Sequence, residues 1–227
     1  MPALPPGGPR VLGGDATLRI NEIFHSIQGE STRAGLPTTF VRLTGCPLRC
    51  GYCDTAYAFH EGETLSIEAV LKAVRGAGAR YVTVTGGEPL AQQNCFELLT
   101  RLCDEGFDVS LETSGAIDVA PADPRVVKIL DIKTPGSGEE ARNRFENLGL
   151  LTNRDQIKFV ICDRADYEWS RELLRRGGFD QRCEVLFSPS HGVLEPGILA
   201  DWILADRLPV RLQIQLHKVL WGDVRGR

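Results

Sequence analysis

Short apolar runs alternate with helical patterns along most of this 227-residue chain. The runs are rich in β-branched and aromatic residues, which favour strands, and the segments between them carry apolar residues at helical spacing. A strand–helix–strand repeat requires parallel strands joined by crossovers, so the alternation predicts an α/β fold. About six units favour an incomplete, open β/α barrel of about six parallel strands. We expect strands at 19–24, 39–43, 81–85, 108–113, 126–133, 157–161, 184–187 and 210–216, and helices at 66–78, 90–106, 139–147, 164–176 and 195–206.

After residue 17, the sequence predicts a single domain, residues 18–227. Residues 1–17 are rich in proline and glycine and lack the apolar core of a signal peptide, so we interpret them as a mobile leader. No apolar run approaches the roughly 20 residues of a transmembrane helix. The formal net charge of −4 argues against a general nucleic-acid or membrane surface. We therefore expect a cytoplasmic protein that binds neither membrane nor nucleic acid.

Residues suited to binding follow the predicted strands. The carboxyl ends of parallel strands meet at one side of the sheet, so the segments after them should line one mouth. These segments are rich in Gly, Ser, Thr or charge: the cysteine loop at 45–55, TGGEP (85–89), ETSG (112–115), DIKTPGSGE (131–139) and FSPSHG (187–192).

The cysteine loop carries Cys46, Cys50 and Cys53 in the spacing C-x3-C-x2-C. Structural zinc sites and ordinary electron-transfer clusters both take four protein ligands. Three thiolates favour an iron–sulfur cluster with one iron open to a ligand, and a zinc site completed by His60 is the alternative. The other four cysteines lie in periodic segments and fit buried positions, and the odd total of seven argues against a disulfide framework.

The loop and its context resemble the radical S-adenosylmethionine superfamily. An aromatic residue, Tyr52, precedes the last cysteine, and TGGEP after the next strand is similar to the second motif of that superfamily. Gly86 and Gly87 carry no side chain that would block a close approach of the backbone to a cofactor. The resemblance implies a 4Fe-4S cluster whose open iron binds S-adenosylmethionine, with reductive cleavage to an adenosyl radical.

The flanking sequence is similar to the 7-carboxy-7-deazaguanine synthase family. The similarity rests on Gln28-Gly29-Glu30, on Arg42 four residues before the first cysteine, on Cys53-Asp54-Thr55, and on the end of the chain, QLHKVLWGDVRGR (215–227). It implies that 6-carboxy-5,6,7,8-tetrahydropterin loses a hydrogen atom from C6, contracts its ring and loses ammonia, with Mg²⁺ required. It also implies a homodimer reduced by a flavodoxin or ferredoxin, and a place in queuosine or other 7-deazapurine biosynthesis.

The resemblance assigns a role to each matching residue. Magnesium is expected at Thr55, with Asp54 as the alternative ligand, and no protein acid or base is expected because the adenosyl radical abstracts the hydrogen. Arg42 could instead pair with Glu30 or Glu88, and His217 could pack at a strand end. Asp131-Ile132 stands where relatives often have Ser-Pro. The cluster is assigned to Cys46, Cys50 and Cys53; the cofactor to Tyr52, Gly87, Thr113, Ser114, Asp131, Ile132, Lys133, Ser188 and His191; and the substrate to Ile27, Gln28, Gly29, Glu30, Arg42, Thr85 and His217.

Two other functions are compatible with parts of the sequence. A glycyl-radical-enzyme activase shares the superfamily motifs but acts on a protein glycine, and the Gln28–Glu30, Arg42 and Thr55 set favours an acidic heterocycle over it. A zinc-binding interaction module would explain the cysteines alone, but not the strand-end motifs.

Overall fold

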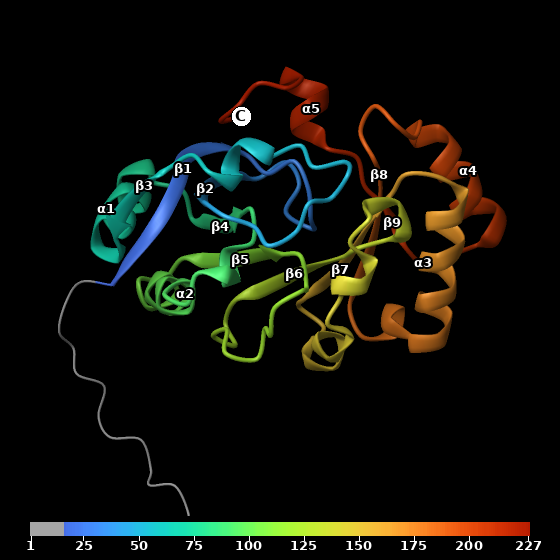
Figure 1. The fold of residues 1–227 in the computed structure, drawn as a ribbon, viewed down its shortest axis with the longest axis horizontal. Helices are drawn as coiled ribbons and strands as arrows, with labels where there is room; N and C mark the ends of the chain where they lie inside the picture. Colours follow the sequence, from blue (N-terminus) through green and yellow to red (C-terminus); the bar gives the residue numbers. More distant parts are fainter. Residues whose placement is uncertain (1–15) are drawn as a thin grey trace, which may run out of the picture.

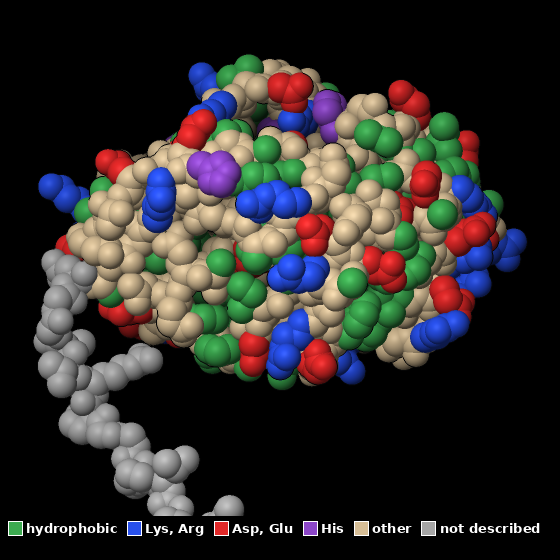
Figure 2. Space-filling model, in the orientation of Figure 1, with side chains coloured by type: hydrophobic (Ala, Val, Ile, Leu, Met, Phe, Trp, Pro, Cys, Tyr) green, Lys and Arg blue, Asp and Glu red, His purple; other side chains and the backbone are tan. Residues whose placement is uncertain are grey.

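The computed structural model describes residues 16–227, and residues 1–15 lie outside the described part. The predicted leader therefore remains a prediction, although Thr17 already belongs to the first strand. No helix in residues 16–227 combines the length and the apolar character that crossing a bilayer requires. Across the face in Figure 2, Lys and Arg side chains are interspersed with Asp and Glu.

One nine-stranded sheet organises the molecule, in the order β3-β1-β2-β4-β5-β6-β7-β8-β9 (Figure 1). From β2 to β9 every neighbouring pair is parallel, which confirms the predicted α/β class and the open, incomplete barrel. The strands are β1 (Thr17–Ile27), β2 (Pro37–Leu43), β3 (Glu63–Ser66), β4 (Tyr81–Gly86), β5 (Asp108–Thr113), β6 (Val127–Ile132), β7 (Gln156–Ile161), β8 (Glu184–Pro189) and β9 (Arg211–Leu212).

Within residues 16–227, the first four α-helices lie along the outside of the curved sheet, and the fifth lies above β1 and β2 (Figure 1). The helices are α1 (Ile67–Ala77), α2 (Cys95–Asp104), α3 (Arg164–Gly177), α4 (Pro196–Asp206) and α5 (Leu216–Trp221). Ser66 caps α1 by accepting a hydrogen bond from the Ala69 amide, as its sequence predicts, and Gly78 ends the helix with a φ of 72°. The buried faces of the helices and strands form one apolar core.

The first three strands depart from the strand–helix alternation. β1 pairs antiparallel with both β2 and β3, so the chain opens with a hairpin and a short edge strand before the parallel part begins. The strand β3 was not predicted, because its sequence ETLS has only one large apolar residue. The hairpin matters for function, since its turn begins at Gln28 at the mouth of the barrel.

Two predicted elements are wrong. The segment 139–147 forms short 3₁₀ turns in place of a helix: it lacks an apolar stripe, and the buried Asn147 uses its amide to bind the Gly115 and Ile117 carbonyl oxygens. The strand expected at 210–216 shrinks to the two residues of β9, because the chain then leaves the sheet and begins α5. The helix predicted from residue 90 begins at Cys95, after a 3₁₀ turn at Pro89–Ala91.

Candidate active site

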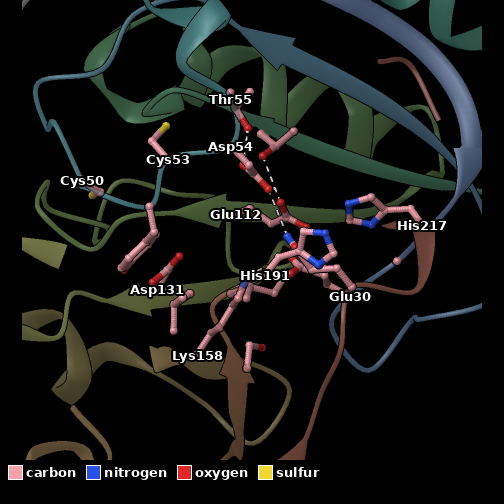
Figure 3. Close-up of a pocket in the computed structure, with 18 of the residues that line it drawn as sticks. Glu30, Cys50, Cys53, Asp54, Thr55, Glu112, Asp131, Lys158, His191 and His217 are labelled. Atoms are coloured by element: carbon pink, nitrogen blue, oxygen red, sulfur yellow. Dashed lines mark hydrogen bonds and ion pairs between the residues drawn. The ribbon is translucent and has the colours of Figure 1, made fainter. Parts of the chain in front are cut away.

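A cavity of about 380 Å³ opens at the carboxyl ends of the parallel strands (Figure 3). Each of the five strand-end segments singled out in the sequence contributes to its wall, as the strand-end rule predicts. The predicted residues that line it are Ile27, Gln28, Gly29, Glu30, Arg42, Cys46, Cys50, Tyr52, Cys53, Thr55, Thr85, Gly87, Thr113, Ser114, Asp131, Lys133, Ser188, His191 and His217.

Ile132 is the exception among the predicted residues. Its side chain is fully buried in the apolar core, because successive residues of a strand face opposite sides of the sheet. Asp131 and Lys133 on either side of it therefore point to the cavity. A cofactor contact of Ile132 can therefore come only from its backbone, and it remains a prediction.

Main-chain hydrogen bonds fix the cysteine loop. The Gly45 amide donates to the Ala58 carbonyl at 2.8 Å, and the Gly51 amide donates to the Ser137 carbonyl at 3.0 Å. On the other side, the Glu88 amide donates to the Gly45 carbonyl at 2.8 Å. The loop is thus clamped by the turns that follow three different strands, β2, β4 and β6.

The three cysteines of this loop are free thiols of intermediate exposure. Burial raises the pKa of the Cys46 and Cys50 thiols, and the nearby positive charge of Lys133 opposes that shift. Within residues 16–227 no three His, Cys, Asp or Glu side chains converge as one metal ion requires. The thiolates of a cluster bind separate irons, so they need not converge on one ion.

Several buried polar atoms at the cavity fit a polar ligand. The Tyr52 hydroxyl, Asp131 Oδ1 and the Ser188 hydroxyl have no hydrogen-bond partner in the described structure, and all three residues line the cavity. Buried polar groups are normally paired, so these atoms suit a ligand with several donors and acceptors, such as a nucleoside with an amino-acid tail. The backbone at Gly87 packs directly against the cysteine loop. A Cβ there would lie 2.3 Å from the Gly45 carbonyl oxygen and 2.7 Å from Cys46 Cβ.

Glu88 connects the turn after β4 to the turn after β5. Its carboxylate is fully buried and accepts hydrogen bonds from the Thr113 hydroxyl at 2.9 Å, from the Ser114 amide at 2.7 Å and from the Ser114 hydroxyl at 2.5 Å. The side chains of Thr113 and Ser114 are therefore occupied by Glu88, although both residues line the cavity. The predicted cofactor contact of Thr113 and Ser114 can come from their backbone or from a second hydrogen bond of their hydroxyls.

Lys133 lies between the cysteine loop and Asp131. Its Nζ is 3.0 Å from Asp131 Oδ2 and 5.7 Å from the centroid of the Tyr52 ring. Although burial favours the neutral amine, the Asp131 carboxylate raises the pKa of Lys133 above its usual value. A buried ammonium beside the cysteine loop stabilises negative charge there, including that of thiolates.

The opposite wall carries largely buried charged side chains, of which Lys158 and Glu112 were not among the predicted site residues. Lys158 on β7 forms an ion pair with Glu30 at 2.7 Å. Glu112 on β5 accepts hydrogen bonds from Thr85 at 3.0 Å and from Gln28 at 3.3 Å. Burial, with the nearby charge of Glu30, raises the pKa of Glu112. Two carboxylates and one ammonium thus share a small volume on this wall (Figure 3).

Asp54 and Thr55 lie above these charges (Figure 3). The Thr55 hydroxyl donates to Asp54 Oδ1 at 2.7 Å, and the Gln215 amide donates to Asp54 Oδ2 at 3.1 Å. Burial opposes ionisation of Asp54, but these hydrogen bonds and the nearby Lys158 and Lys218 hold its pKa below the usual value. Because the Thr55 hydroxyl donates its hydrogen to Asp54, the lone pairs of its oxygen remain available to a cation.

Arg42 pairs with neither of the two acidic residues considered from the sequence. Its Nε donates to Glu22 Oε1 at 2.8 Å, while its guanidinium lies against the rings of Phe24 and Tyr57. With Nε bound to Glu22, the guanidinium can still offer both Nη groups to a ligand in the cavity that it lines.

His217 lies within α5 and not at the end of a strand. Its Nδ1 occupies the space beside Gly29, where a Cβ would lie 2.0 Å from it. Burial lowers the pKa of His217. The imidazole faces the cavity next to the Gln28–Glu30 turn, and its burial favours the neutral form.

Known proteins are similar in sequence to nearly the whole chain. Residues 40–177 match the Radical SAM superfamily. The 7-carboxy-7-deazaguanine synthase of Chlorobaculum tepidum is 47% identical over 93% of this chain and 98% of its own length. That of Koribacter versatilis is 44% identical over 90% of this chain and 97% of its own. This chain belongs to the 7-carboxy-7-deazaguanine synthase family of the Radical SAM superfamily.

Solved structures agree with this family assignment. The crystal structure of QueE from Escherichia coli superposes with a TM-score of 0.73 at 26% identity, covering 88% of this chain and 95% of that one. Streptococcus suis SuiB bound to S-adenosylmethionine superposes with a TM-score of 0.54 at 13% identity, which shows a shared fold alone. A Radical SAM protein of this family uses a 4Fe-4S cluster, S-adenosylmethionine and Mg²⁺. The three thiols, the unpaired polar atoms of Tyr52, Asp131 and Ser188, and the side-chain-free backbone at Gly87 fit such a set.

Sequence reasoning missed part of the wall of this family site. In the sequence, Glu112 is only the first residue of ETSG, and Lys158 is only a member of a predicted strand. A charged residue within an apolar run, as in QIKFVI (156–161), is the signal that could have identified Lys158. The other lining residues not predicted are Phe24, Ser31, Phe40, Leu48, Phe59, Ile129, Val160, Pro189, Ser190, Gln215, Lys218, Asp223 and Arg227.

Proposed function

We propose that this chain converts 6-carboxy-5,6,7,8-tetrahydropterin to 7-carboxy-7-deazaguanine with loss of ammonia. The observation that carries the proposal is a cavity in which a three-cysteine loop faces a wall of buried, paired charges. When bound, the cluster and S-adenosylmethionine supply the radical that removes a hydrogen atom from C6 of the substrate. The charged wall opposite suits a flat heterocycle that has amine and carbonyl groups on one edge and a carboxylate on the other.

Different residues of this wall can bind different groups of the substrate. Glu30 and Glu112 are acceptors for the exocyclic amine and ring N–H groups of a pterin, and Gln28 can pair with a neighbouring edge atom. Arg42 can bind the substrate carboxylate through its free Nη groups, since a guanidinium matches a carboxylate bidentately. His217 can donate or accept a hydrogen bond at the substrate.

On the cysteine-loop side of the cavity, different residues would bind the cluster and the different parts of S-adenosylmethionine. Cys46, Cys50 and Cys53 would hold the cluster, and the backbone at Gly87 would approach the methionine end of the cofactor. Tyr52, Asp131, Lys133, Ser188 and His191 surround the space for its nucleoside part. Thr55 is the protein ligand that we assign to Mg²⁺; magnesium keeps several waters, so a single hydroxyl can suffice when the substrate supplies oxygens. Asp54 then orients the Thr55 hydroxyl.

The biological setting extends the proposal. We infer a homodimer in the cytoplasm that takes electrons from a flavodoxin or ferredoxin and supplies queuosine or another 7-deazapurine. A size-exclusion and light-scattering measurement tests the dimer, and turnover with either reductant in place of dithionite tests the electron donor.

The deciding experiment is anaerobic. The protein is reconstituted with iron and sulfide, reduced, and given S-adenosylmethionine, Mg²⁺ and 6-carboxytetrahydropterin, and the products are followed by mass spectrometry. We expect 7-carboxy-7-deazaguanine. Formation of 5′-deoxyadenosine without any deazapurine, together with turnover on a glycyl-radical partner protein, would instead favour the activase alternative.

A further inference from the structure

The C-terminal segment, residues 213–227, folds back across the cavity. The Gln213 amide donates to the Phe187 carbonyl at 2.9 Å, and the Leu216 amide donates to the Gly29 carbonyl at 3.0 Å. In Figure 1, α5 and the end of the chain lie above β1 and β2. Three residues of this segment beyond His217, namely Lys218, Asp223 and Arg227, line the cavity, so the segment forms part of its wall.

Apolar packing contributes little to the position of this segment. No residue of the six-residue helix α5 is buried. Val219, Leu220 and Val224 are 68%, 50% and 55% exposed. A helix this short is marginal by itself, and segments with few buried apolar contacts open at low free-energy cost. Specific polar contacts must therefore hold the segment against the barrel.

Beyond α5, Arg225 makes several of these contacts. Its Nη1 is 2.8 Å from Glu61 Oε2, and its Nη2 donates to Asn21 Oδ1 at 3.1 Å. The guanidinium carbon lies 4.0 Å from the centroid of the Tyr57 ring. A planar guanidinium suits such simultaneous pairing and stacking, which an ammonium cannot reproduce.

The same arginine reaches the carboxylate that holds Arg42. Arg225 Nε lies 3.5 Å from Glu22 Oε2, while Glu22 Oε1 accepts hydrogen bonds from Arg42 Nε and from the Tyr57 hydroxyl, each at 2.8 Å. Glu22 and Arg42 are each 16% exposed, so this shared carboxylate is largely shielded from solvent. Two arginines therefore share one carboxylate: Arg42 on the cavity wall and Arg225 on the segment that covers the cavity.

We propose that Arg225 is a positioning residue that clasps the C-terminal segment over the cavity and, through the shared Glu22, orients Arg42. Closing the cavity and aligning the arginine that faces the substrate carboxylate are then one event. The orienting part rests on the function proposed above, whereas docking of the segment does not depend on it.

The test compares Arg225→Gln and Arg225→Lys with wild type in the reconstituted enzyme. Arg211→Gln is the matched control, because it removes an exposed ion pair to Glu184 on the far strands β8 and β9. Hydrogen–deuterium exchange is measured for the amides of residues 216–222 without substrate. We expect Arg225→Gln to accelerate their exchange about fivefold or more, Arg225→Lys to fall between, and Arg211→Gln to match wild type.

Turnover kinetics give the second readout. Arg225→Gln should raise the KM for the carboxypterin about fivefold to thirtyfold while kcat changes by less than about threefold, since Arg225 does not touch the substrate itself. Unchanged exchange at 216–222 would overturn the clasp, and faster exchange with an unchanged KM would overturn its coupling to Arg42. If wild-type enzyme made no deazapurine, the proposed function would fail, while the exchange result would still decide the clasp.

Discussion

On the cysteine-loop side of the cavity, backbone amides and carbonyls of three turns make the contacts that fix the wall. On the Glu30 side, the wall consists of side-chain charges, with Lys158 paired to Glu30 and Glu112 held by Gln28 and Thr85. The first wall depends on where the backbone runs and on small residues that let it approach a ligand. The second depends on the balance of buried charge, which a single substitution can upset.

The largest expected effect is on the cysteine-loop wall, in Cys50→Ala. Removing one of three thiolates should abolish the 4Fe-4S cluster, and turnover should fall to the detection limit. Iron content and the visible absorption of the reconstituted protein measure the loss. Cys103→Ala, on α2 and away from the cavity, is the control and should keep both. A brown, cluster-loaded Cys50→Ala protein would contradict the assignment.

Lys158→Met tests the charged wall. It leaves Glu30 and Glu112 as two buried carboxylates without their ammonium, so the free energy of unfolding should drop by about 3–5 kcal/mol. Urea denaturation at pH 7 measures the change. Lys72→Met on the exposed face of α1 removes a solvated lysine and should change the stability by no more than about 0.5 kcal/mol. Equal losses in the two variants would show that the charges of this wall are not coupled.

Gly87→Ala tests the steric side of the comparison. Its Cβ would lie 2.3 Å from the Gly45 carbonyl oxygen, so the turn must shift away from the cysteine loop. Affinity for S-adenosylmethionine should fall about fivefold to a hundredfold, measured by equilibrium binding to the reconstituted protein. Gly51→Ala is matched to it, because there the nearest atom lies 3.9 Å away. If Gly87→Ala bound S-adenosylmethionine as tightly as wild type, the close packing at Gly87 would not matter for the cofactor site.

The smallest effect is a pH dependence from Glu112. Burial raises its folded pKa, so the stability contributed by the protonated carboxyl is complete below about pH 4.3 and is lost as the pH rises through the folded pKa. Glu112→Gln cannot ionise, and its unfolding free energy should therefore gain on wild type with increasing pH, by at most about 1.4 kcal/mol per pH unit. Urea denaturation of both proteins between pH 5 and 8 measures this difference. Parallel stability curves would show that Glu112 does not titrate in this range.

The same contrast explains what the sequence could predict. The alternation of strands and helices and the strand-end rule placed nearly all of the motif residues at one mouth, because local pattern and parallel topology determine those positions. Glu112 and Lys158 lie at single strand positions where only the register of β5, β6 and β7 brings them beside Glu30. That register is a property of the assembled sheet, and no local pattern encodes it.

The two errors in the fold have a related cause. The segment 210–216 alternates apolar and polar residues like a strand, yet it pairs with β8 at only two residues before it turns towards Gly29. The segment 139–147 turns repeatedly because Asn147 serves the carbonyl groups of a distant loop. In both places long-range hydrogen bonds outweighed the local preference of the chain.

The hydrogen bond between Leu216 and Gly29 joins two ends of the cavity wall that are separated by most of the chain. A protein is synthesised from its N-terminus, so the three cysteines leave the ribosome long before the C-terminal segment that completes the cavity wall. Contacts between such distant residues also close late, since the loop entropy must first be overcome. The Leu216–Gly29 contact therefore cannot form until nearly the whole chain has been synthesised, and the three-cysteine loop exists before the C-terminal wall of its cavity does.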